Sequence, residues 1–190
     1  TGLRRSGRRV LTVGTDCALG KKYTALALTR AFQAAGVSAT FRATGQTGIM
    51  ISGSGVAIDA VVADFVAGAA EWLSPANDPA HWDIIEGQGS ILHPGYAGVS
   101  LGLMHGSQAD ALVLCHDPLR THIDGYETFP IPPLDEVMAL HLQLARRTNP
   151  AARFVGIALN TSRLTPQDAA QLLAKSTERH GLPAIDPLRS

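Results

Sequence analysis

A glycine-bounded loop between an apolar strand and a strong helix is the feature that most constrains this chain. The loop follows the apolar run at residues 9–13 and consists of Gly14, Thr15, Asp16, Cys17, Ala18, Leu19, Gly20, Lys21 and Lys22. Glycines let the backbone approach an anion closely, backbone N–H groups at a helix start point toward it, and a lysine there neutralises its charge. The pattern therefore predicts a phosphate-binding loop inside an α/β fold.

The spacing of this loop departs from the common one. Five residues separate Gly14 from Gly20, and Lys22 stands where Ser or Thr usually follows the lysine. A plain strand-to-helix turn is the alternative interpretation. The Gly20-Lys21 pair at the start of a helix, directly after a buried strand, favours phosphate binding.

The composition indicates a globular protein with no strong electrostatic preference. A length of 190 residues suits one α/β domain, so we treat residues 1–190 as a single domain. Because 16 basic residues balance 16 acidic ones, we expect neither a nucleic-acid nor a membrane partner. Two cysteines without a signal peptide predict reduced thiols and a cytoplasmic location. A first residue that is Thr1 rather than Met suggests a piece of a longer protein.

Alternating strands and helices define the expected architecture. Short continuous apolar runs predict strands over residues 9–13, 38–43, 81–85, 111–115, 154–159 and 182–185. Helical periodicity predicts helices over residues 21–35, from after Gly55 to about 73, and over 95–105, 134–147 and 166–180. This order predicts a P-loop NTPase-like α/β fold, with a mostly parallel sheet and helices on both faces.

The helix that ends near residue 73 is expected to bury one apolar stripe. Its members are Val61, Phe65, Ala69 and Trp72, which lie on one face at helical spacing. The glycines and hydroxyls of residues 44–55 precede this helix. They suit an anion or polar ligand at a helix N-terminus, or they serve only as turns.

Titratable groups follow two of the predicted strands. Glu86 ends the strand at residues 81–85, and His116, Asp117, Arg120 and His122 follow the strand at 111–115. The carboxyl ends of parallel strands are where such folds bind ligands, so these groups are candidate acid–base and anion-binding residues. Glu86 could also be a capping or salt-bridged carboxylate. We expect no bound metal at the second group, because it lacks a histidine pair on one helical face.

Two resemblances arise from these motifs. Gly14-Thr15-Asp16-x-x-x-Gly20-Lys21, followed by Glu86-Gly87-x-Gly89, resembles dethiobiotin synthetase and its P-loop relatives. The blocks at 14–21, 59–69, 86–90 and 115–123 more closely resemble the uncharacterised-domain family that includes D-glutamate N-acetyltransferase. That resemblance implies an N-terminal domain in addition to this one. It also implies acyl transfer from acetyl-CoA to the amino group of an acidic D-amino acid.

The leading functional hypothesis is therefore an N-acyltransferase. The loop would bind the phosphates of acetyl-CoA, Glu86 or His116 would deprotonate the substrate ammonium, and Arg120 would bind a carboxylate of the amino-acid substrate. One alternative is a ligase or phosphotransferase that uses ATP with Mg²⁺, with Glu86 near the metal. Another is a non-catalytic nucleotide-binding module. The expected partners are the small-molecule amino acid, the missing N-terminal domain and further copies in a homo-oligomer.

The doubled lysine predicts ligand binding that does not depend on a metal. Lys22 places an ammonium where a Mg²⁺-binding hydroxyl would stand, which favours direct contact between lysine and phosphate. Titration calorimetry should give CoA or ADP the same affinity in excess EDTA as in millimolar Mg²⁺. The Lys22→Thr variant should move the site toward Mg²⁺ dependence. An EDTA-induced loss of about tenfold or more in the parent, equivalent to about 1.4 kcal/mol, would favour the ATP-dependent alternative instead.

Overall fold

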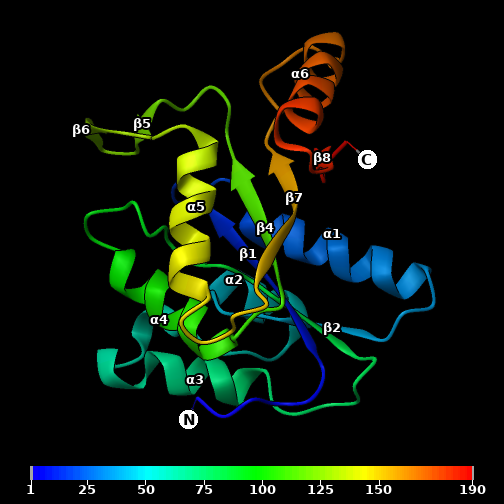
Figure 1. Cartoon of the computed structure of the whole chain (residues 1–190), viewed down its shortest axis with the longest axis vertical. Helices are drawn as coiled ribbons and strands as arrows, with labels where there is room; N and C mark the ends of the chain where they lie inside the picture. Colours follow the sequence, from blue (N-terminus) through cyan, green and yellow to red (C-terminus); the bar gives the residue numbers. More distant parts are fainter. Residues whose placement is uncertain (1, 190) are drawn as a thin grey trace.

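The computed structural model describes residues 2–189 and contains a six-stranded sheet in which every pairing is parallel. The strand order is β2-β3-β1-β4-β7-β8, and Figure 1 shows β1, β4 and β7 side by side in the middle of the molecule. The strand bounds are β1 Arg8–Gly14, β2 Ala39–Arg42, β3 Trp82–Ile85, β4 Ala111–His116, β7 Arg153–Leu159 and β8 Ala184–Ile185. The predicted mostly parallel sheet is confirmed.

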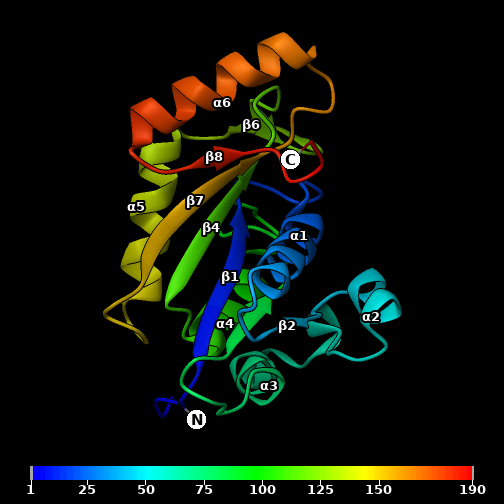
Figure 2. The same cartoon turned by 90° about the vertical axis from the view of Figure 1, so that its right-hand side faces the viewer.

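Helices cover both faces of this sheet (Figure 2). The helix bounds are α1 Lys21–Ala34, α2 Gln46–Ser52, α3 Val66–Leu73, α4 Ala97–Ser107, α5 Leu134–Ala145 and α6 Pro166–His180. Successive strand residues point to opposite faces, so Val10 packs in the core beneath α1, whereas Leu11 and Val13 pack in the core shared with α3, α4 and α5. No helix formed by residues 2–189 is long and apolar enough to cross a membrane.

The parallel arrangement brings the predicted site segments to one edge. β1 pairs in parallel with both β3 and β4, so the three strands end at the same edge, with Ile85 opposite Leu11 and Cys115 opposite Gly14. The phosphate-loop candidate, Glu86 and the His116 segment each follow one of these strand ends. Their predicted placement at a common edge is confirmed.

Two helix ends follow the expected local chemistry. Gly36 has a φ of 74° after α1, and Val37 donates its N–H to the carbonyl of Phe32, so the helix ends in a glycine-dependent turn. At the start of α6, Thr165 accepts a hydrogen bond from the N–H of Asp168, and Pro166 occupies the first helical position. Both ends are thus fixed by the residues next to them in the sequence.

The prediction of one long helix before residue 73 is wrong. Residues 58–60 and 63–65 form two single 3₁₀ turns, and α3 begins only at Val66. Its buried residues are Val66, Ala70 and Leu73. Of the predicted stripe, Val61 and Ala69 pack half-buried against the core, whereas Phe65 and Trp72 are exposed. The buried face is therefore rotated by about one residue from the predicted stripe.

Close packing of α3 on α4 explains this rotation. A Cβ built on Gly102 would come within 2.6 Å of Val66 Cγ1, and one on Gly106 would overlap the carbonyl of Ala67. These glycines lie four residues apart on one face of α4, where they let Val66 and Ala67 at the start of α3 approach closely. Helix periodicity within α3 carries no information about that groove.

Three short elements lie outside the predicted ones. The helix α2 lies in the glycine-rich stretch at residues 44–55, and β5 (His122–Ile123) pairs with β6 (Tyr126–Pro130) in an antiparallel hairpin. All three are short, so they leave little periodicity in the sequence.

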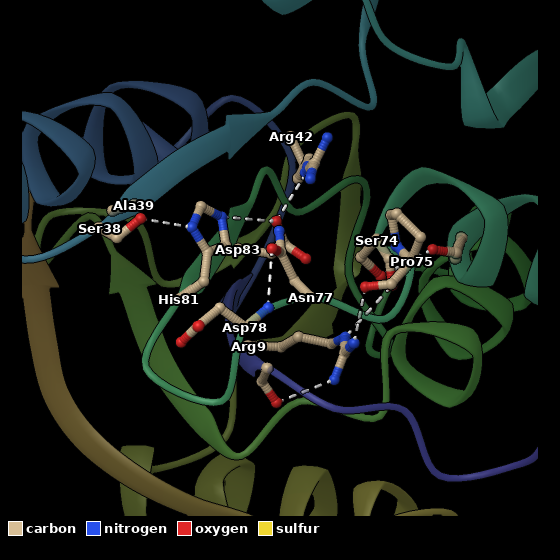
Figure 3. Close-up of polar contacts among 12 residues, drawn as sticks. Arg9, Ser38, Ala39, Arg42, Ser74, Pro75, Asn77, Asp78, His81 and Asp83 are labelled. Atoms are coloured by element: carbon tan, nitrogen blue, oxygen red, sulfur yellow. Dashed lines mark hydrogen bonds and ion pairs between the residues drawn. The ribbon is translucent and has the colours of Figure 1, made fainter.

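A buried polar network lies at the opposite, amino-terminal edge of the sheet (Figure 3). Asp83 accepts a hydrogen bond of 2.7 Å from Arg42 Nε, and His81 Nδ1 lies 2.8 Å from Ser38 Oγ. The guanidinium of buried Arg9 donates to five backbone carbonyls, those of Arg5, Ser6, Gly7, Ser74 and Pro75. The first two contacts hold β2 to β3, whereas those of Arg9 hold the start of β1 to the loop after α3, so both sets have a structural role.

The α3–α4 contact predicts a large difference between two Gly→Ala substitutions in one helix. Gly106→Ala should lower the free energy of unfolding by at least about 1–3 kcal/mol, because the new methyl group overlaps backbone atoms that cannot move aside. Gly98→Ala meets no atom within 4 Å, so stability should be unchanged or higher by up to about 1 kcal/mol. Urea unfolding followed by circular dichroism measures both. Equal stability of the two variants would contradict this account.

Candidate functional site

The loop between β1 and α1 presents free backbone donors. Ala18 and Gly20 have positive φ values of 54° and 106°, and α1 begins without a side-chain cap. The N–H groups of Ala18, Leu19 and Gly20 donate to no protein atom among residues 2–189. Unpaired N–H groups at a helix start attract anions. The loop therefore fits a phosphate group.

Lys21 is a buried cation beside these donors. Only 6% of the residue is exposed, and Nζ donates to the carbonyl oxygen of Asp16 at 2.7 Å. Burial lowers the pKa of this ammonium. Within residues 2–189, Lys21 forms no salt bridge. A buried ammonium without a carboxylate partner destabilises the domain, and a bound anion would remove that cost.

The first turn of α1 offers little to a metal ion. Lys22 Nζ lies 4.6 Å from the centroid of the Tyr23 ring. The first aliphatic hydroxyl in α1 belongs to Thr24, which is buried. This hydroxyl donates to the carbonyl of Gly20 and accepts from the thiol of Cys115. The Thr24 hydroxyl is thus engaged in both directions.

Glu86 shares a cavity with both lysines. The cavity has a volume of about 490 Å³ and is lined by residues 17–23, 45–47, 59 and 86–89. Desolvation raises the pKa of Glu86, although hydrogen bonds from the backbone of Thr44 and Gly45 and the charges of Lys22 and Lys21 oppose the rise. A carboxyl group with a raised pKa in a cavity is a candidate proton acceptor.

The second glycine-rich stretch surrounds this carboxylate. The N–H groups of Thr44 and Gly45 donate to Glu86 Oε2 at 3.0 and 3.1 Å, and a Cβ on Gly48 would overlap the same oxygen. The anion near the start of α2 is therefore the protein's own Glu86. The only sequence signal for this contact was the glycines of residues 44–55. No local pattern pairs residue 44 with residue 86, because the two are far apart in the chain.

Arg120 lies against the phosphate-loop candidate. Its Nη1 donates to Asp16 Oδ2 at 2.8 Å and to the carbonyl of Cys17 at 2.9 Å. Desolvation opposes ionisation of Asp16, but hydrogen bonds from Asp124, Arg120 and Cys17 outweigh it and lower the pKa of the carboxyl group. Arg120 thus holds the loop in place. Its Nε and Nη2 donate to no atom among residues 2–189 and remain open to a ligand.

His116 lies in a second cavity. Its Nδ1 is 2.9 Å from the hydroxyl of Thr15, and desolvation lowers its pKa to about 4, so the ring is neutral at pH 7. The second cavity has a volume of about 650 Å³, and its lining includes His116, Arg120, Lys175 and apolar residues of α5 and α6. The structure thus places Glu86 with the lysines and His116 with Arg120, on either side of the loop segment at residues 15–17.

The two cysteines lie close to the site in thiol form. Burial raises the pKa of Cys17, and burial raises that of Cys115 to about 11. Among residues 2–189, ligand-type atoms of Asp16, Cys17 and His93 lie within 4.8 Å of one another. Asp16 already accepts three hydrogen bonds, which indicates a role in holding the loop.

Two curated relatives match nearly the whole chain. The chain is 53% identical over 188 residues to a D-glutamate N-acetyltransferase of Tritonibacter scottomollicae, with 99% of the chain and 56% of the relative covered. It is 52% identical to a protein of the same name from a Pseudoalteromonas species, with 99% and 57% covered. The chain thus spans little more than half the length of these curated relatives.

Solved structures extend the comparison. A DUF1611 family protein from Anabaena variabilis ATCC 29413 superimposes with a TM-score of 0.91 at 44% identity, covering 97% of this chain and 55% of that one. A nucleotide-binding protein from Archaeoglobus fulgidus in complex with ADP gives a TM-score of 0.57 at 14% identity, with 94% and 80% covered, and shows the fold alone. The predicted P-loop NTPase-like fold is confirmed.

The family assignment rests on the full length of the chain. Residues 1–190 match the family described as "Domain of unknown function (DUF1611_C) P-loop domain". The resemblance recognised from the sequence motifs is therefore confirmed: the chain belongs to the DUF1611 family, as its P-loop domain.

Proposed function

We propose that this domain binds acetyl-CoA within an N-acetyltransferase, and that the full protein transfers the acetyl group to the amino group of an acidic amino acid, D-glutamate or a close analogue. The names of the relatives at 52% and 53% identity support the reaction class. We also propose that the protein acts in the cytoplasm, because two free thiols suit a reducing compartment.

The observation that carries this proposal is the buried charge of Lys21 beside three unpaired N–H groups. CoA carries a pyrophosphate and a 3′-phosphate, and direct contact with ammonium and N–H groups can bind both without a metal. The residues Gly14, Thr15, Asp16, Cys17, Ala18, Leu19, Gly20, Lys21 and Lys22 would hold these phosphates. The engaged hydroxyl of Thr24 favours CoA over a nucleotide bridged by Mg²⁺.

Glu86 is our first candidate for the proton acceptor. It takes one proton from the substrate ammonium, the freed amine nitrogen bonds to the acetyl carbonyl carbon, and the carbon–sulfur bond breaks. The departing thiolate takes the second nitrogen proton and leaves as CoA thiol, while the proton on Glu86 passes to water. Desolvation raises the pKa of Glu86, so this carboxylate binds a proton more readily. The nearby lysines favour its ionised form, so it is able to accept that proton.

His116 and Arg120 provide the other half of the proposed site. The free Nε and Nη2 of Arg120 suit a substrate carboxylate, and Lys175 adds positive charge to the same cavity. A neutral His116 beside them is the second candidate for the proton acceptor. Which of the two groups accepts the proton depends on the cavity into which the amine points.

The direct test is product analysis with the full-length protein. Acetyl-CoA and D-glutamate should give N-acetyl-D-glutamate and free CoA, detected by mass spectrometry. Turnover of labelled ATP without acetyl transfer would instead support the ligase or phosphotransferase. Ligand binding without either reaction would support a non-catalytic nucleotide-binding module.

Replacing Lys21 should separate binding from stability. Lys21→Met keeps the volume but removes the charge, so the affinity for CoA should fall by about 1.5–3 kcal/mol. The free energy of unfolding without ligand should stay equal or rise, because a buried unpaired ammonium is removed. Calorimetry and urea unfolding measure the two quantities. Lys22→Met removes the same charge from the neighbouring lysine and should leave the free energy of unfolding unchanged. Undiminished affinity for CoA in Lys21→Met would overturn the phosphate-loop assignment.

The pH dependence of kcat/KM should identify the proton acceptor. The acceptor must be deprotonated, so activity should fall as pH decreases through its pKa, which burial raises from the ordinary value for Glu86 and lowers to about 4 for His116. Glu86→Gln should lower turnover by about 10²-fold or more and abolish this acidic limb.

The comparison variants make this assignment decisive. If His116→Asn loses the acidic limb instead, His116 is the acceptor. His180→Ala should keep parental kinetics, because His180 pairs with Asp135 away from the loop. Parental turnover in both Glu86→Gln and His116→Asn would refute the proposed chemistry.

A further inference from the structure

The helix α3 carries two apolar faces, and only one of them is covered. Val66, Ala70 and Leu73 are buried against the rest of the domain. On the neighbouring face, Phe65 and Trp72 are 68% and 74% exposed, and Val62 in the preceding turn is 68% exposed. Phe65 and Trp72 lie seven residues apart and therefore on one face, with the half-buried Ala69 between them at i+4.

This exposed stripe differs from scattered surface hydrophobics. A helix that is apolar on two adjoining faces is typical of one buried on both, and large aromatic side chains are enriched where protein surfaces meet. The close fit of Gly102 and Gly106 against Val66 and Ala67 fixes which face of α3 meets α4. The helix therefore cannot rotate to bury Trp72 within this domain.

The start of the described chain lies on the same helix. The N–H of Gly2 donates to Glu71 Oε2 at 3.2 Å, and the carbonyl of Gly2 accepts from Gln108 Nε2 at 3.1 Å. Figures 1 and 2 both show the N-terminus beside α3. Any polypeptide that precedes this domain would therefore start beside α3, at the position of Glu71.

The relatives supply the size of what can cover the stripe. The 188 matched residues are 56% of the Tritonibacter relative, so roughly 150 of its residues lie outside the match, which is the size of a domain. The family description marks this P-loop domain as the C-terminal one. A preceding domain of that size would begin its contact with the P-loop domain at α3.

We propose that the stripe formed by Val62, Phe65, Ala69 and Trp72 is the docking surface for the N-terminal domain of the full-length protein. The interface is intramolecular and apolar, with Trp72 and Phe65 at its centre. It holds the N-terminal domain on the face of the P-loop domain that adjoins α4.

Residue-specific oxidative footprinting of the full-length protein tests this surface. Hydroxyl radicals oxidise exposed tryptophans, and mass spectrometry gives the rate for each one. Trp82 is the internal reference because it is half-buried against Phe32 within the P-loop domain itself. In the monomeric full-length protein, Trp72 should be oxidised more slowly than Trp82, and about tenfold more slowly than in the isolated 190-residue chain.

Two variants of the full-length protein provide a second readout. Trp72→Asp should raise hydrogen exchange of the peptide covering residues 62–73, whereas Leu188→Asp, at another exposed leucine, should not. Faster oxidation of Trp72 than of Trp82 in the full-length protein would overturn the proposal. So would protection of Trp72 that depends on protein concentration and coincides with a dimer in sedimentation, because the occupant would then be a second copy of the chain.

Discussion

The junction between Thr12 and Gly87 determines the geometry of the whole site. The N–H of Gly87 donates to Thr12 Oγ1 at 2.9 Å, and this hydroxyl lies 3.2 Å from the carbonyl of Lys21, so one buried side chain connects β1, α1 and the end of β3. A Cβ on Gly87 would overlap the carbonyl of Thr12, so only glycine permits this approach. The junction brings Glu86 into the cavity that holds the lysines.

The loop that follows this junction is organised for an anion at some cost in stability. Its own acid, Asp16, is neutralised by Arg120 and by backbone donors, and Lys21 has no salt-bridge partner among the described side chains. A domain optimised only for folding would pair or remove a buried ammonium. Retaining one next to unpaired N–H groups is the strongest physical argument that this edge of the sheet binds phosphate.

The two faces of α3 show what helical periodicity in a sequence cannot determine. The spacing of Phe65, Ala69 and Trp72 correctly indicates an apolar helix face, but the glycines of α4 select the neighbouring face for the core of this domain. Periodicity identifies which residues share a face, and only packing decides which face is covered. The aromatic residues left outside have a straightforward explanation if a second domain packs there.

Local chemistry in the sequence by itself determined the parallel α/β sheet, the glycine-bounded loop and the helix ends at Gly36 and Thr165, because each depends on neighbouring residues. It also placed Glu86 and His116 at one edge, since parallel strands share a direction. Only the tertiary structure decided that these two residues line different cavities and that Arg120 holds the loop. Those relations join residues far apart in the chain, and no local pattern encodes their distances.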